Sequence, residues 1–162
     1  MSNYSNIVQF DDANSNGYAV TIFMTGCSHG CEGCQNPSTW DCNTGKPFDE
    51  NVQQQIIEHI KENESFYEAF VFSGGDPLHN ANLSTTINFA KELKSLFTNI
   101  KIWIYTGYDF KNIPRCNEIL ECTDYIKCGK YDKSESCHSD NIQYDIRLAT
   151  SNQKIYKKGV DY

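Results

Sequence analysis

The chain has 162 residues, with 14 basic and 21 acidic side chains and a formal net charge of −7. A domain of this length can bury a core that is stable without disulfides. The acidic balance and the scattered basic residues argue against a nucleic acid or an anionic membrane as the main partner.

The first twenty residues lack the basic and apolar pattern of a secretory leader, and no run of about 18 apolar residues follows. We therefore expect a cytoplasmic protein that forms a single domain over residues 1–162. In a reducing compartment, clustered thiols bind metal or do redox chemistry more often than they pair as disulfides.

The first half of the chain predicts a hairpin followed by alternating helices and strands. Strands are expected at 7–10 and 18–24, joined by the polar turn "DDANSNG". Apolar residues at helical spacing predict helices from Asp49 to about Ser65 and over 83–97. Short apolar runs predict strands at 69–72, 100–105 and 125–126, whereas the polar tract 127–145 reads as a mobile loop.

This order of elements predicts an α/β fold with a mostly parallel sheet built from right-handed βαβ units. Three unusual loops follow strands: the cysteine loop after Met24, "SGGDP" after Phe72 and "TGY" after Tyr105. Because ligands gather at the carboxyl ends of parallel strands, we expect these loops to meet at one edge of the sheet.

Three cysteines, Cys27, Cys31 and Cys34, lie within the first of these loops, "MTGCSHGCEGCQNPSTWD". Structural zinc takes four ligands, so three thiols on one loop are one short. A four-iron cluster on three thiolates would leave one iron open to a small molecule. Three alternatives remain at this point: a chance grouping of buried thiols, a zinc site completed by His29, Cys42 or His138, and an electron-transfer cluster completed by Cys42.

The cysteine motif, together with "GGD" closing the next strand, resembles the radical S-adenosylmethionine enzymes. Further segments are similar to the activating proteins of anaerobic ribonucleoside-triphosphate reductases: "GKPF" at 45–48, "FSGGDPLH" at 72–79, "WIYTGY" at 103–108 and "SNQ" at 151–153. They occur in family order over almost the whole chain.

The resemblance implies an open, partial β/α barrel with an N-terminal hairpin, in which Cys27, Cys31 and Cys34 bind a 4Fe–4S cluster. One electron, from a donor such as flavodoxin, would cleave S-adenosylmethionine to methionine and a 5′-deoxyadenosyl radical. This radical would take a hydrogen atom from a glycine of the partner reductase and leave a glycyl radical. Cluster and cofactor would carry the chemistry, so no protein base or nucleophile is expected.

The resemblance also places S-adenosylmethionine on particular residues. Gly74 and Gly75 have no Cβ, so their backbone could approach the methionyl end of the cofactor closely. Asp76 would accept a hydrogen bond from the ammonium group of the cofactor or brace the loop. The remaining expected contacts are made by Gly33, Cys34, Gln35, Asn36 and Thr106. Trp40 is interpreted as core packing.

Five further cysteines do not fit a cluster and are expected to be free thiols: Cys42, Cys116, Cys122, Cys128 and Cys137. The alternative functions are activation of another glycyl radical enzyme, radical chemistry on a small molecule, or a non-enzymatic protein stabilised by zinc or carrying electrons.

Overall fold

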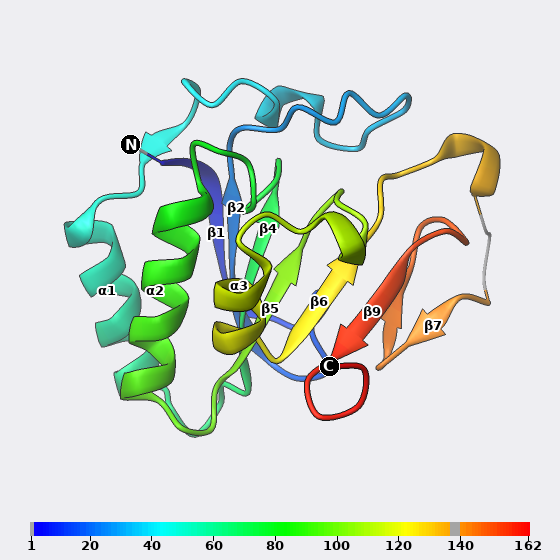
Figure 1. The fold of residues 1–162 in the computed structure, drawn as a ribbon. Helices are drawn as coiled ribbons and strands as arrows, with labels where there is room; N and C mark the ends of the chain where they lie inside the picture. The colour runs from blue at the N-terminus through cyan, green and yellow to red at the C-terminus, as the bar shows by residue number, and fades with distance from the viewer. Residues whose placement is uncertain (1, 137–139) are drawn as a thin grey trace.

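A computed structural model describes residues 2–136 and 140–162, and its central feature is one seven-stranded sheet (Figure 1). The strand order is β3-β1-β2-β4-β5-β6-β9, so the sheet is open rather than closed into a barrel. Its strands are β1 (Asn3–Asp11), β2 (Ala19–Met24), β3 (Lys46–Pro47), β4 (Ala69–Gly74), β5 (Lys101–Tyr105), β6 (Tyr125–Cys128) and β9 (Lys154–Lys157).

The four central strands, β2, β4, β5 and β6, run parallel, while β1, β3 and β9 pair antiparallel at the flanks. The parallel strands are joined by helices, because a parallel connection needs a crossover. Their carboxyl ends therefore lie at one edge of the sheet, where the loops that follow them come together.

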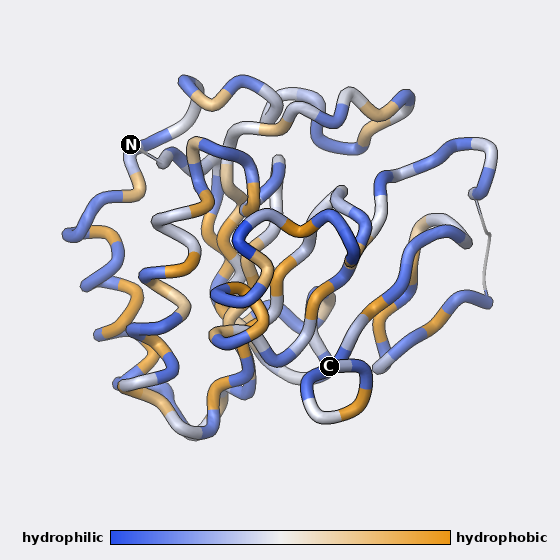
Figure 2. Tube along the Cα trace, viewed as in Figure 1, coloured by the Kyte–Doolittle hydropathy of each residue, from blue (hydrophilic) through white to orange (hydrophobic). Residues whose placement is uncertain are grey.

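Three helices lie on one face of this sheet: α1 (Glu50–Glu62), α2 (Leu83–Leu96) and α3 (Cys116–Cys122) (Figure 1). Asp49 begins α1, since its carboxylate accepts a hydrogen bond from the backbone N–H of Val52 at 3.0 Å. Apolar side chains of the helices pack against the mostly hydrophobic central strands (Figure 2). Phe89 of α2, for example, lies edge-on to Phe70 and Phe72 of β4.

The opposite face carries a second, smaller hydrophobic cluster. Trp103 of β5 is fully buried there and stacks on Tyr125 of β6, with ring centroids 4.0 Å apart. The C-terminal part of the chain, including the small hairpin of β7 (Ile142–Gln143) and β8 (Ile146–Arg147), supplies Ile146 and Leu148 to this cluster. The two faces of the sheet are thus covered by different parts of the chain.

The predicted open α/β fold with an N-terminal hairpin is confirmed, and several smaller elements were not foreseen. Strand β3, helix α3 and strands β7 to β9 are too short for hydrophobic periodicity to indicate them. The tract 127–145 is more ordered in secondary structure than a plain loop, since its described residues include the end of β6, the 3₁₀ helix Lys133–Glu135 and β7, while its mobility stays a prediction. Cys137 and His138 lie outside the described residues. Within the described ranges, no helix is long and apolar enough to cross a membrane.

Candidate functional site

Three loops meet at the carboxyl edge of the parallel strands, as their positions in the sequence predict. The backbone N–H of Gly75, after β4, donates to the carbonyl of Met24 at 2.8 Å. The N–H of Asp76 donates to the carbonyl of Gly26 at the same distance, which fixes the start of the cysteine loop. The far end of that loop returns to its beginning, since the N–H of Cys27 donates to the carbonyl of Trp40 at 2.9 Å.

A cavity of about 270 Å³ lies where these loops converge. Cys27, Cys31 and Cys34 all line it, and so do six of the eight residues expected to bind cofactor. These six are Cys34, Gln35, Asn36, Gly74, Gly75 and Thr106. The other two, Gly33 and Asp76, are not among its lining residues.

Gly74 and Gly75 are glycines because other backbone lies against them. Gly74 has φ +99°, and a Cβ there would meet the backbone N and O of Met24 at 2.5 Å. A Cβ on Gly75 would meet the carbonyl oxygens of Thr39 and Gly26 at 2.7 and 2.8 Å. The pair therefore allows β4 and the cysteine loop to approach each other closely, while both residues also face the cavity.

Asp76 is buried beneath the cavity and links the three loops. Its carboxylate accepts from the backbone N–H groups of Leu78 and Gly107, at 2.8 and 3.0 Å, and from the Thr106 hydroxyl at 2.9 Å. It also lies 2.6 Å from Nε2 of His29, within the cysteine loop. This geometry favours the second of the two roles considered for Asp76, that of a brace.

His29, expected from the sequence only as a possible zinc ligand, is a residue of the site. Its imidazole is held by Asp76, lies edge-on to the ring of Tyr108 with centroids 4.8 Å apart, and covers Gly107. A Cβ on Gly107 would collide with the His29 ring. A histidine between two clustered cysteines was the available signal, but its partner, 47 positions away in the sequence, could not be foreseen.

Trp40 does not belong to the core, contrary to the interpretation from its sequence context. Its side chain is partly exposed and lines the cavity. Asn36 lies nearby, and its backbone N–H donates to Sγ of Cys34 at 3.4 Å. The backbone of the loop thus contacts one of the cysteine sulfurs directly.

Comparison with known proteins agrees with this arrangement. A family model described as "4Fe-4S single cluster domain" matches residues 13–156. The "Anaerobic ribonucleoside-triphosphate reductase-activating protein" of Enterobacteria phage T4 is 37% identical over 132 residues, covering 82% of this chain and 83% of its own length. The chain belongs to the family of anaerobic ribonucleoside-triphosphate reductase-activating proteins. Members with the same name from Pasteurella multocida and Escherichia coli K12 are 32% identical over 158 residues and 30% identical over 130 residues, and cover 97% and 84% of their own lengths.

The donor set of this family member fits a 4Fe–4S cluster better than a single metal ion. Cys27, Cys31 and Cys34 are free and partly exposed around one cavity. In the described part of the chain, no three Cys, His, Asp or Glu side chains converge as ligands of one ion. A cubane is bound through a different iron by each thiolate, so its ligands lie farther apart than those of one zinc ion.

The surroundings of Cys27 change the pKa of its thiol. Burial raises the pKa of Cys27, and the nearby Asp76, Cys31 and Cys34 raise it further. Burial and the neighbouring negative charges both disfavour the thiolate. The positive charge of bound iron would offset them, and cysteine binds a metal as the thiolate.

The cysteines outside the motif are placed differently. Cys122 and Cys128 are buried in the helix-covered core, where burial raises the pKa of their thiols to about 11 and about 12. Cys42 and Cys116 are also free, and none of these four lines the cavity. These four form no disulfide in the described part of the chain, their role as free thiols stays a prediction, and Cys137 lies outside the described residues.

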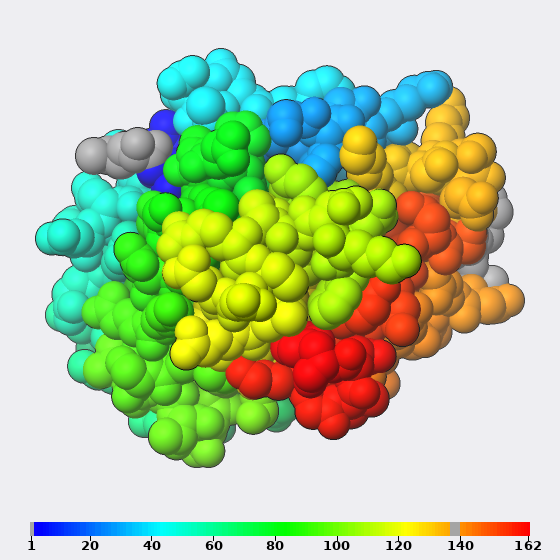
Figure 3. All heavy atoms as spheres, viewed as in Figure 1, coloured from blue at the N-terminus to red at the C-terminus, as the bar shows by residue number. Residues whose placement is uncertain are grey.

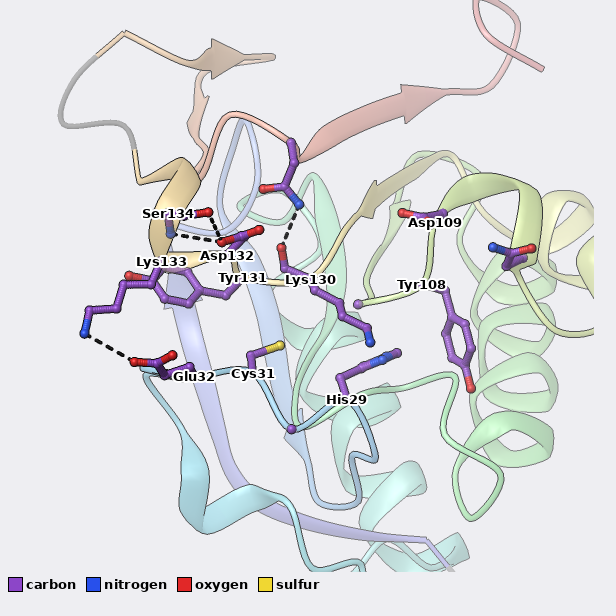
Figure 4. A pocket seen from close by; sticks show the side chains of 14 residues that line it. His29, Cys31, Glu32, Tyr108, Asp109, Lys130, Tyr131, Asp132, Lys133 and Ser134 are labelled. Carbon is purple, nitrogen blue, oxygen red and sulfur yellow. Dashed lines mark hydrogen bonds and ion pairs between the residues drawn. The ribbon is translucent and has the colours of Figure 1, made fainter.

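A larger open groove of about 1090 Å³ adjoins the cavity (Figure 4). His29 and Cys31 form one side of it, with Tyr108 and Asp109 beside them and the segment 130–134 opposite. In the space-filling view the cysteine loop runs along the top of the molecule and meets this segment (Figure 3). Groove and cavity share His29, Cys31, Gly107, Lys130 and Tyr131, so they form one continuous site.

Proposed function

We propose that this chain is a radical S-adenosylmethionine enzyme that generates a glycyl radical on an anaerobic ribonucleoside-triphosphate reductase. One structural observation carries the proposal: three cysteines, and no fourth described cysteine, line the cavity formed by the family's other motifs. A cluster held by Cys27, Cys31 and Cys34 would leave one iron without a protein ligand.

The position of Cys42 supports this proposal over a simple electron carrier. Cys42 was the available fourth thiolate, but its side chain lies against Gly26 and does not line the cavity. A closed cluster would need this thiol among its ligands. An open set of three ligands instead suits a cofactor that completes the coordination.

Together, the bound cluster and S-adenosylmethionine would supply one-electron reduction and hydrogen-atom abstraction. The chain's own residues would position these groups and exclude water. Asp76 and His29 hold the cysteine loop, while Gly74, Gly75 and Thr106 line the cavity where the cofactor would lie. Gln35 and Asn36 line the same cavity and would contact the cofactor together with Cys34. We assign Gly33 only the backbone turn beside Cys34, since it has φ +75°.

The groove supports a protein rather than a small molecule as the substrate. It opens to solvent along residues 130–134 and reaches Cys31. A loop carrying a glycine could enter from the groove and place its Cα–H near the cofactor, where positioning governs the rate. The partner that we propose is the anaerobic reductase that appears in the names of the relatives. Flavodoxin is the electron donor that we propose. The enzyme would act in the cytoplasm as a single domain of residues 1–162.

The test is anaerobic incubation of the cluster-reconstituted protein with the reductase, S-adenosylmethionine and a reductant. We expect a glycyl doublet in the electron paramagnetic resonance spectrum, with 5′-deoxyadenosine and methionine as products. Omitting S-adenosylmethionine should remove the doublet and both products.

Two other outcomes separate the alternatives. Cofactor cleavage without a doublet would point to a different glycyl radical enzyme or to a small-molecule substrate. A reduced cluster that leaves S-adenosylmethionine intact would contradict the proposal and favour an electron carrier.

A further inference from the structure

Lys127 of β6 is a partly buried cation in the cavity for which the proposed function gives no role. Its side chain lines the same cavity as Cys27, Cys31 and Cys34. In the register of the sheet it lies beside Tyr105, and its Nζ is 4.6 Å from the centroid of that ring.

In the described part of the chain, no carboxylate pairs with this cation. Among the described residues, none forms a hydrogen bond or an ion pair with the Lys127 ammonium group. Burial alone lowers the pKa of Lys127 to about 8. A partly desolvated charge without a counter-charge is unfavourable, so its presence points to an anionic group that occupies the cavity when the site is complete.

Asp76, the buried carboxylate that links the loops of the site, is not that group. It is already paired with His29 and accepts from Thr106 and Gly107, and it does not line the cavity. The thiols that do line it bind iron as thiolates. Three thiolates outweigh the positive charge of an oxidised four-iron core, so the bound cluster is anionic and becomes more so on reduction.

We propose that Lys127 is the charge partner of the iron–sulfur cluster and raises its reduction potential. Reduction adds negative charge to the cluster, and a cation in the same cavity stabilises the reduced form more than the oxidised one. The effect is strong where water is excluded, because the effective dielectric is low. Lys127 is thus a residue that tunes the cluster and makes no bond to it.

Lys133 provides a matched control of the same residue type near the same loop. Its side chain is exposed and lies 3.5 Å from the carboxylate of Glu32, between Cys31 and Cys34 in the sequence. Solvent and this partner screen its charge from the cavity. Removing it should leave the cluster potential unchanged.

The experiment is an anaerobic redox titration of the reconstituted protein, followed by electron paramagnetic resonance, without S-adenosylmethionine or reductase. For Lys127→Met we expect the reduction equilibrium constant to fall on the order of tenfold, which is about 59 mV more negative for one electron. Lys127→Arg should keep the wild-type potential, and so should Lys133→Met.

A Lys127→Met potential equal to or above that of the wild type would overturn the proposal, and so would an equal shift in Lys133→Met. If Lys127→Met does not take up the cluster, Lys127→Gln replaces it with the same expected shift and the same contrary result. The inference rests on the proposed cluster ligands but not on cofactor cleavage. Wild-type protein that gains no cluster would overturn both, whereas a cluster insensitive to Lys127 would overturn this inference alone.

Discussion

Replacing Cys31 by alanine is expected to abolish stable binding of the 4Fe–4S cluster and all activity that depends on it. Cys31 lines the cavity together with Cys27 and Cys34, and no other described cysteine lies there to replace it. With only two thiolates, two of the four irons would have no protein ligand, and the cluster would dissociate. Iron and sulfide content after anaerobic reconstitution, together with the visible absorption of the cluster, measures the result.

Cys122→Ala is the matched control for this change. Cys122 is buried in the core formed by the helices, and its Sγ donates to the carbonyl of Ile119 at 3.5 Å. Its loss should lower stability slightly and leave iron content unchanged. Full iron content in Cys31→Ala, or loss of iron in Cys122→Ala, would show that the ligands have been assigned wrongly.

Replacing Asp76 by asparagine is expected to destabilise the site although the side chain keeps its shape. The Asp76 carboxylate accepts from Leu78, Thr106 and Gly107, and an amide would turn an N–H group toward one of these donors. A buried donor left without an acceptor costs about 1–3 kcal/mol. We therefore expect a decrease of roughly 2–3 kcal/mol in the free energy of unfolding of the metal-free protein, measured in urea. Cluster uptake should also be weaker.

Asp132→Asn controls for the chemical change itself. Asp132 accepts from the backbone N–H and the hydroxyl of Ser134, at 2.9 and 2.6 Å, but lies exposed at the rim of the groove. A surface change of this kind should alter stability by no more than about 0.5 kcal/mol. Equal urea midpoints for Asp76→Asn and the wild type would rule out Asp76 as a brace.

The sequence predicts the elements that follow a regular hydrophobic pattern. Ile56, Ile57 and Ile60 mark the buried face of α1, and the apolar run from Ala69 marks β4. Such elements are specified locally, because their side chains repeat with the period of the helix or the strand. Helix α3 has only seven residues, and β9 depends on pairing with β6, so neither is evident from local pattern.

The candidate site is predictable to the extent that its residues form a compact motif. The three cysteines and the glycine pair stand out in the sequence, and the structure brings both groups to one cavity. The contacts of Asp76 with His29 and the exposure of Lys127 to the cavity depend on how separate strands pack. The glycine pair also shows that one residue type can satisfy two requirements, since protein backbone and cavity both border Gly75.

The central claim is that the cavity holds a cluster in which one iron has no protein ligand, and that S-adenosylmethionine completes the coordination of this iron. The most direct measurement is a titration of the reduced, reconstituted protein with S-adenosylmethionine, followed by electron paramagnetic resonance at low temperature. We expect the cluster signal to convert to a new one as the cofactor binds, and Cys122→Ala to behave in the same way. A reduced cluster whose spectrum stays the same at saturating S-adenosylmethionine would contradict the claim.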